Sequence, residues 1–279
     1  MSITPKTKLC MVIGDPVEHS LGPQMHNAAY QELGIDSDYV YVACKVQVSD
    51  IPDFIKGVRA MGIRGVSCTI PHKTAVMEYL DTLDPVAEKI GAVNTIVNDD
   101  GVLRGYNTDW LGAVVPLEQI GPLKNKKVAL IGAGGAAKAI AYGVMQRGAL
   151  LTVYNRTQSK AEALASEFGA AVGSLDSPSD ITRDDIIINA TSVGMAPHQD
   201  ESPLEKQYIT AEHIVFDVVY SPYETKLLKD AKEQGAQVIH GSEMLLQQGV
   251  AQFKLYTGYD APENVMRSAL RKALGIGEE

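Results

Sequence analysis

The sequence predicts an α/β protein with two domains. Segments with strand patterns alternate with segments of helical periodicity along the whole chain, which is typical of α/β layering. One βαβ unit is especially clear, with a strand at 127–131, a helix at 135–147 and a strand at 150–154. The chain has 279 residues, a length that suits two domains better than one.

Short apolar runs that end at turn residues organise the chain before residue 109. The sequence Asn98-Asp99-Asp100-Gly101 is a strong turn signal between two such runs, and it predicts a hairpin. We expect strands at 9–13, 39–42 and 66–70, helices at 24–33 and 52–61, and hairpin strands at 93–97 and 103–106.

The chain after residue 109 continues the alternation around a loop at 121–125 that has the character of a linker. Two apolar stripes at helical spacing, within 245–255 and 265–274, predict helices at the C-terminal end. Besides these and the βαβ unit, we expect a helix at 110–117 and strands at 186–189, 214–218 and 237–239.

Composition excludes several classes of partner. The net charge of −9 disfavours nucleic acid, whose phosphates need a basic face. No apolar run reaches roughly 18 residues, so we expect no membrane partner, and residues 1–8 lack the apolar core of a signal peptide. The odd set of Cys10, Cys44 and Cys68 has no metal-ligand spacing. We therefore expect three reduced, buried thiols, no metal and a cytoplasmic location.

Residues 132–137 match the dinucleotide pattern G-x-G-x-x-A. The pattern follows a predicted strand and opens a predicted helix, the context that a dinucleotide turn requires. Its first glycine permits a tight turn, its second lets backbone approach a pyrophosphate, and its alanine lets helix and strand pack closely. The helix N-terminus offers N–H groups to the phosphates. The cofactor candidates are Gly132, Ala133, Gly134, Gly135 and Ala136, with Ala137 as the packing residue.

The cofactor is predicted to be NADP. The adenosine ribose should lie where the strand after the glycine turn ends, and a carboxylate there would select NAD by accepting from the ribose 2′-hydroxyl. The chain instead has Asn155, Arg156 and Thr157. The Arg156 guanidinium can form a fork on a 2′-phosphate, and Thr157 can donate a hydroxyl.

Two polar segments are candidates for the reaction centre. The first, 67–73, ends with Lys73 at the start of a predicted helix, where a cation is unfavourable to the helix dipole. Such a broken local rule is a place to look for function. In the second, 107–110, Asp109 is either a reactive carboxylate or simply a helix cap. A histidine at a helix start, such as His72, is more often a surface residue than a proton carrier.

Six segments, in order over nearly the whole chain, resemble the shikimate dehydrogenase family. Each is unremarkable alone, and the specificity lies in their combination and order. They are Thr69-Ile70-Pro71-His72-Lys73, Gly91-Ala92-Val93-Asn94-Thr95, Asn107-Thr108-Asp109, Gly132 to Ala137, Asn155-Arg156-Thr157 and Gly241 to Gln248.

The resemblance implies an α/β catalytic, substrate-binding domain at 1–108 and 241–279, and a Rossmann-type NADP domain at 109–240. It implies that the chain interconverts 3-dehydroshikimate and shikimate, with Lys73 and Asp109 as the catalytic pair. Desolvation would lower the pKa of the lysine and the nearby carboxylate would raise it, and the sequence leaves that balance open. The implied substrate residues are Ser20, Gly22, Thr69, Asn94, Tyr220 and Gln248, and further cofactor residues are Thr191, Val193, Val218 and Gly241.

The chain departs from the family at two positions. Gly22 stands where the second of two carboxylate-gripping hydroxyls is usual, and Ser67 stands where asparagine is usual. A backbone N–H released by the permissive φ of glycine could replace the lost hydroxyl, or a different substrate could fill the space.

Several alternatives therefore stay open. The substrate could be shikimate, quinate, an amino analogue or a smaller relative. A non-catalytic NADP-binding regulator is the remaining alternative, and the presence of both Lys73 and Asp109 argues against it. The sequence is silent on whether the chain is a monomer or a homodimer.

Overall fold

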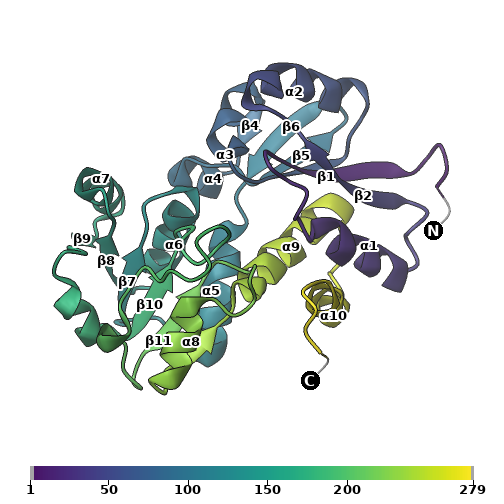
Figure 1. Ribbon diagram of the computed structural model, residues 1–279. Helices are drawn as coiled ribbons and strands as arrows, with labels where there is room; N and C mark the ends of the chain where they lie inside the picture. Colours follow the sequence, from purple (N-terminus) through teal and green to yellow (C-terminus); the bar gives the residue numbers. More distant parts are fainter. Residues whose placement is uncertain (1–2, 278–279) are drawn as a thin grey trace. The chain divides into compact units, whose positions relative to one another are not determined.

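The computed structural model describes residues 3–277 and divides into two compact units (Figure 1). The first unit contains the chain up to Thr108 and from Gln248 onward, and the second is Asp109–Gln247. The second crossing therefore falls inside helix α9 (Gly241–Thr257) rather than at its first residue. The functional assignment of 1–108 with 241–279, and of 109–240, stays a prediction.

The first unit is built on a mixed six-stranded sheet with the order β2-β1-β3-β5-β6-β4. Strand β1 is parallel to both β2 and β3, whereas β5 is antiparallel to both β3 and β6. Its elements are β1 (Lys8–Gly14), α1 (Gly22–Glu32), β2 (Tyr39–Lys45), η1 (Val48–Asp50), α2 (Ile51–Ala60), β3 (Gly65–Cys68), α3 (His72–Ala75), η2 (Met77–Tyr79), β4 (Thr82–Leu83), α4 (Pro85–Ile90), β5 (Thr95–Asp99), β6 (Val102–Tyr106), the end of α9, and α10 (Glu263–Ala273).

Different helices pack against the two sides of this sheet. Helix α2 places Ile51, Ile55 and Val58 in a core with strand residues such as Ile13 and Val66. On another side, Tyr30 of α1 packs against Phe253 of α9 with ring centroids 5.3 Å apart. The sheet is thus covered by helices that come from both ends of the sequence.

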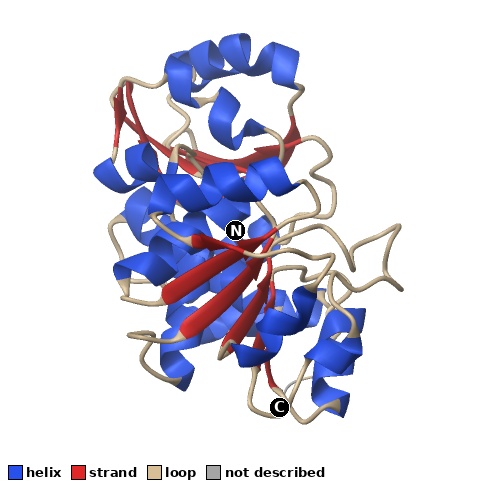
Figure 2. Ribbon diagram, turned by 90° about the vertical axis from the view of Figure 1, so that its left-hand side faces the viewer, coloured by secondary structure: helices blue, strands red, loops and turns tan. Residues whose placement is uncertain are grey.

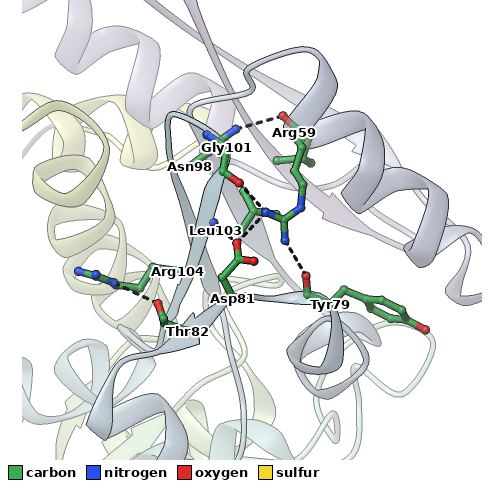
Figure 3. Close-up of polar contacts among 9 residues, drawn as sticks. Arg59, Tyr79, Asp81, Thr82, Asn98, Gly101, Leu103 and Arg104 are labelled. Atoms are coloured by element: carbon green, nitrogen blue, oxygen red, sulfur yellow. Dashed lines mark hydrogen bonds and ion pairs between the residues drawn. The ribbon is translucent and has the colours of Figure 1, made fainter.

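Arg59, near the end of α2, ties three segments of the first unit together (Figure 3). Its guanidinium donates to the Asp81 carboxylate and to the backbone carbonyls of Gly101 and Tyr79. Asp81 also accepts from the Leu103 N–H at 2.7 Å. This cluster joins α2 to the β5–β6 hairpin and to the segment that leads into β4.

The second unit has a fully parallel six-stranded sheet with the order β12-β11-β10-β7-β8-β9. This is the doubly wound order of a dinucleotide fold, in which the strand order reverses between the first and fourth strands, here β7 and β10. Its elements are α5 (Asp109–Ile120), β7 (Lys127–Ile131), α6 (Gly135–Gln146), β8 (Leu150–Tyr154), α7 (Gln158–Phe168), β9 (Ala171–Val172), η3 (Pro178–Arg183), β10 (Ile186–Asn189), η4 (Lys206–Tyr208), β11 (Ile214–Asp217), α8 (Lys226–Glu233), β12 (Gln237–Ile239) and the start of α9.

Alternation along β7 explains the two covered faces of this sheet (Figure 2). Val128 and Leu130 join the core that contains α5, α6 and α7, whereas Ala129 and Ile131 join the core that contains α8. Successive side chains of a strand point to opposite faces. A strand buried on both faces must therefore be apolar throughout, as in a parallel sheet.

Most of the expected elements are present, with shifted ends. Strand β3 ends at Cys68 rather than Ile70, and Ile70, which precedes a proline, is 73% exposed. Helices α4, α7 and α8 were not predicted. Two of them carried start signals in the sequence, since Asp84 caps α4 and Thr225 caps α8 through their side chains. Within residues 3–277, no helix combines the length and apolar character needed to cross a bilayer.

Replacing Arg59 with methionine should destabilise the first unit by about 1.5–3 kcal/mol, the usual value of hydrogen bonds to a charged group. Amide exchange of residues 95–106 would measure the effect on the hairpin. Lys56→Met is the matched control, because Lys56 lies on the same helix in a highly exposed pair with Asp53 and such pairs contribute little. Equal effects of the two variants would contradict a joining role for Arg59.

Candidate functional site

Gly132 lies at the point where the strand order of the second unit reverses. It follows β7 with φ +122°, and a Cβ at this position would come within 2.9 Å of the Ala190 carbonyl oxygen after β10. Both the backbone angle and the close approach of the two strand ends therefore require glycine. Ligands of doubly wound folds bind in the crevice at this reversal point.

Helix α6 begins directly after this turn with its N-terminal N–H groups available to an anion. Gly134 at its N-cap has no side-chain cap, and no acidic residue lies in the first turn. A Cβ at Gly134 would meet no protein atom within 4 Å. Gly135 and Ala136 are half-buried in the first turn, as is Ala133 before it, whereas Ala137 is fully buried in the core. These features fit a pyrophosphate on the helix terminus.

The segment after β8 presents a cation with no carboxylate at the strand end. Arg156 and Thr157 are exposed, and Thr157 forms no side-chain cap on α7. Asn155 is half-buried, and its side-chain amide donates to the Thr157 carbonyl at 2.9 Å. That hydrogen bond holds the turn in which Arg156 is displayed, so the residues fit a 2′-phosphate.

Asn189, at the end of β10, braces the loop that carries Thr191 and Val193. The Asn189 side-chain oxygen accepts from the Thr191 N–H at 3.0 Å and from the Thr191 hydroxyl at 2.7 Å. The Thr191 hydroxyl accepts from the Val193 N–H, and the Asn189 amide donates to the Val193 carbonyl. The predicted residues Thr191 and Val193 thus belong to one hydrogen-bonded loop.

Asp217, at the end of β11, organises the neighbouring strand end. Its carboxylate accepts from the Asn189 amide at 2.9 Å, from the Thr225 hydroxyl at 2.6 Å and from the Val219 N–H at 3.0 Å. Burial raises the pKa of Asp217 to about 6, and these three hydrogen bonds oppose the rise only in part. The carboxylate therefore lies in a site that penalises its charge.

Val218, Tyr220 and Gly241 gather around this second strand end. Val218 and Tyr220 are half-buried, and burial raises the pKa of the Tyr220 hydroxyl. Gly241 begins α9, and a Cβ there would come within 2.6 Å of the Val218 carbonyl oxygen. The four predicted positions Thr191, Val193, Val218 and Gly241 all follow or face the C-terminal ends of β10 and β11.

In the first unit, Lys73 lies in the short helix α3 after β3, as predicted, and is half-buried. Thr69 lies between β3 and α3 and is half-buried, and its backbone N–H donates to the Ile13 carbonyl at 3.0 Å. The expectation that His72 lies on the surface is wrong, because His72 is fully buried and its Nε2 lies 2.8 Å from the Val46 carbonyl oxygen. This contact anchors the first residue of α3, directly before Lys73.

Asn94 is held by the segment that leads to Asp109. Its side-chain oxygen accepts from the Thr108 N–H at 2.8 Å, and its side-chain nitrogen donates to the Thr108 hydroxyl at 2.9 Å. Asn107 is fixed in the same way by its amide, which donates to the Ala92 carbonyl at 2.9 Å. Asp109 follows as the first residue of α5 and is 5% exposed.

The structure shows the backbone and the surroundings of Gly22. Gly22 lies in the first turn of α1 with an ordinary φ, and its N–H donates to the Ser20 hydroxyl oxygen at 3.4 Å. A Cβ at Gly22 would lie 3.2 Å from the ring edge of Tyr41. Gly22 therefore uses no positive φ, and a side chain at this position would pack tightly against Tyr41. Ser20 itself is half-buried beside it.

Gln248, on α9, is half-buried. Four other residues of the first unit form a polar cluster that the sequence-based site did not contain: Tyr41, Thr95, Gln252 and Tyr256, all joined through Ser67 or Asn94. In the second unit, Asn189 and Thr225 were missed in the same way. A polar residue at the end of an apolar strand was the available signal for Asn189.

Two expectations about thiols and metals can be compared with the structure. Cys10 and Cys68 are buried, but Cys44 is only partly so, which corrects the expectation of three buried thiols. Cys44 lies near the end of edge strand β2, where its neighbours Ala43 and Lys45 are exposed and burial decreases toward the strand end. In the part of the chain that the structure describes, no three His, Cys, Asp or Glu residues are grouped to hold a metal ion.

Comparisons with known proteins agree along the whole chain. Family models match at residues 12–96 (shikimate dehydrogenase substrate binding domain), 116–218 (shikimate / quinate 5-dehydrogenase) and 241–271 (shikimate 5'-dehydrogenase C-terminal domain). The chain is 42% identical to the shikimate dehydrogenase (NADP(+)) of Moorella thermoacetica, covering 99% of this chain and 96% of the relative.

Solved structures give the same result. A shikimate dehydrogenase in complex with NADP+ has a TM-score of 0.93 and 43% identity, covering 99% of this chain and 98% of the other. The enzyme of Thermus thermophilus, in complex with NADP(H) and shikimate, has a TM-score of 0.90 and 38% identity, covering 96% of this chain and 100% of the other.

The raised pKa of Asp217 predicts a pH-dependent effect of Asp217→Asn. Between the ordinary value of 3.8 and about 6, the folded state keeps a proton that the unfolded state has released. Wild-type stability therefore falls as pH rises through this window and stays lowered above it. The variant should gain on the order of 1–3 kcal/mol relative to wild type between pH 4 and 7.

Fluorescence of Trp110, the single tryptophan, would follow denaturant unfolding, since it lies in α5 of the same unit. The control is Asp185→Asn. Burial alone would raise the pKa of Asp185, but the Lys127 N–H and Lys126 lower it below its ordinary value. The Asp185→Asn variant should therefore lose stability relative to wild type as pH rises, the opposite of Asp217→Asn. A difference in unfolding free energy between Asp217→Asn and wild type that does not change with pH would contradict the idea that burial destabilises the charged Asp217 carboxylate.

Proposed function

The chain belongs to the shikimate dehydrogenase family, and on that premise we propose that it catalyses the NADP-dependent interconversion of 3-dehydroshikimate and shikimate. The observation that carries the proposal is the geometry of the second unit. A glycine turn at the strand reversal opens an uncapped helix, and Arg156 is displayed at the next strand end without a competing carboxylate. This arrangement fits a dinucleotide that bears a 2′-phosphate.

A nicotinamide bound at this site would supply the hydride for ketone reduction and would accept it in the reverse direction. The chain's own residues must then handle the proton. We assign that proton to Lys73, whose ammonium donates to the ketone oxygen in reduction and whose neutral amine accepts from the hydroxyl in oxidation. Asp109 is assigned as the partner of Lys73. It directly follows Thr108, which forms two hydrogen bonds with the Asn94 side chain.

Substrate binding is assigned to polar side chains of the first unit. Ser20, with the Gly22 N–H already donated to it, provides one hydroxyl for the carboxylate. Thr69, Asn94 and Gln248 provide donors and acceptors that suit several ring hydroxyls, and Tyr220 of the second unit is assigned to the same substrate. The assigned NADP residues are Gly132, Ala133, Gly134, Gly135, Ala136, Asn155, Arg156, Thr157, Thr191, Val193, Val218 and Gly241.

We further propose a cytoplasmic enzyme that is a monomer or a homodimer. None of Cys10, Cys44 and Cys68 forms a disulfide, as is usual in a reducing compartment.

The proton role predicts that Lys73→Ala lowers kcat for shikimate oxidation by roughly 10²–10⁴-fold, the range for general acid–base catalysis. The KM for NADP+ should stay near the wild-type value. Absorbance at 340 nm measures both. Lys89→Ala, in α4 of the same unit, should keep wild-type turnover, and near-native turnover in Lys73→Ala would rule out the proton role.

The 2′-phosphate role predicts that Arg156→Ala weakens NADPH binding by about 1.5–3 kcal/mol, the range for hydrogen bonds to a charged group. NADH binding should barely change, because it has no 2′-phosphate. Fluorescence titration with each nucleotide measures this. Arg183→Ala is a matched control, since Arg183 is an exposed arginine of the same unit paired with Asp180. Equal weakening for both nucleotides would show that Arg156 is structural.

A further inference from the structure

A chain of buried hydrogen bonds leads from Tyr41 to Asn94 within the first unit. Tyr41 donates to Ser67 at 2.6 Å, and Ser67 to the Gln252 side-chain oxygen at 2.8 Å. The Gln252 side-chain nitrogen donates to the Thr95 hydroxyl at 2.9 Å, which donates to the Asn94 side-chain oxygen at 2.7 Å. These five side chains come from β2, β3, α9, β5 and the residue before β5, and each is at most 6% exposed.

Backbone groups fix the direction of every bond in this chain. The Gln252 side-chain nitrogen also lies 3.3 Å from the Asn94 backbone carbonyl, which can only accept, so the nitrogen must face that way. The Thr108 N–H, which can only donate, faces the Asn94 side-chain oxygen at 2.8 Å. Thr95, between these two amides, must therefore accept from Gln252 and donate to Asn94.

The same argument fixes the direction of the hydrogen bonds at the Tyr41 end of this chain of bonds. Because the Gln252 nitrogen is turned to Thr95, its oxygen faces Ser67, whose single hydroxyl hydrogen goes there. Ser67 must then accept from Tyr41, and also from Tyr256, whose hydroxyl lies 2.9 Å away. Burial raises the pKa of both tyrosine hydroxyls above their ordinary value, so both keep the hydrogen that they donate.

Tyr41 is further held by packing. Its ring stacks on His26 with centroids 4.3 Å apart and an interplanar angle of 4°. Burial lowers the pKa of His26 to about 3, so this histidine is neutral. The edge of the Tyr41 ring lies against Gly22. Ser67 and Gly22, the two positions where the chain departs from its family, are therefore both in contact with one fixed tyrosine.

We propose that Thr95 and Gln252 are positioning residues that hold the Asn94 amide with its nitrogen, not its oxygen, as the group offered to substrate. The inference rests on the proposed function, in which Asn94 contacts the substrate. The substrate atom that meets Asn94 is then a hydrogen-bond acceptor, a hydroxyl or carbonyl oxygen. An isosteric change at Thr95 or Gln252 removes one of the hydrogen bonds that oppose rotation of this amide and leaves the Thr108 contacts to oppose it alone.

Steady-state kinetics of Thr95→Val and Gln252→Leu test the proposal. Each variant should raise the KM for shikimate about 3- to 10-fold, the effect of one misplaced hydrogen bond, with kcat changed less and the KM for NADP+ unchanged. Thr95→Ser keeps the hydroxyl and should restore the wild-type KM. A purely structural role would lower stability without this selective change and without rescue by serine.

Thr257→Val is the matched control, because it also removes a threonine hydroxyl from a hydrogen bond in the same unit, to the Phe253 carbonyl at 2.8 Å, outside the chain of bonds. Its KM for shikimate should equal that of wild type. An unchanged KM in both Thr95→Val and Gln252→Leu, or a Thr95→Ser variant as impaired as Thr95→Val, would overturn the proposal.

Neutron diffraction of the wild-type protein is the second measurement, and it needs no variant to fold. It should place the Thr95 hydroxyl hydrogen on the line to the Asn94 side-chain oxygen, and a hydrogen directed elsewhere would overturn the proposal. Failure of the wild-type protein to oxidise shikimate with NADP+ would instead contradict the proposed function, and the neutron result would still decide the hydrogen-bond direction.

Discussion

The hydrogen bond from the Thr108 N–H to the Asn94 side-chain oxygen is the contact on which the polar interior of the first unit depends. A backbone N–H cannot change its role, so it decides which end of the Asn94 amide is which. Thr95 and Gln252 then have one consistent arrangement, and a buried network that is fully satisfied specifies a single conformation. The same short segment continues to Asp109, so the position of the Asp109 backbone is linked to the side-chain amide of Asn94.

The second unit uses the same device at its strand ends. Asn189 divides its amide between the loop of Thr191 and Val193 and the carboxylate of Asp217. Asp217 in turn holds the Val219 N–H and Thr225. A buried carboxylate costs free energy, as the raised pKa of Asp217 shows, yet it accepts from three donors at once. Polar side chains at the ends of β10 and β11 in this way hold the loops that follow these strands.

Tyr41 gives a physical account of the two departures from the family pattern. Its ring lies 3.2 Å from the place where a Cβ at position 22 would stand, and its hydroxyl donates to Ser67. A glycine and a small hydroxyl residue at these positions are thus two responses to one buried ring.

The sequence by itself determined the α/β class, the parallel βαβ unit at 127–154 and the candidate residues that sit at strand ends, because period, turn residues and glycine spacing are local properties. It also placed Lys73 at a helix start and Asp109 at the beginning of α5. Tertiary structure decided the contacts between residues that are distant in the sequence, which local patterns do not contain. His72 is buried with the carbonyl of Val46, the residue after β2, as its partner, and the tight surroundings of Gly22 come from a tyrosine nineteen positions along the chain. The orientation of Asn94 depends on Gln252, 158 residues away, since only folding brings those two amides together.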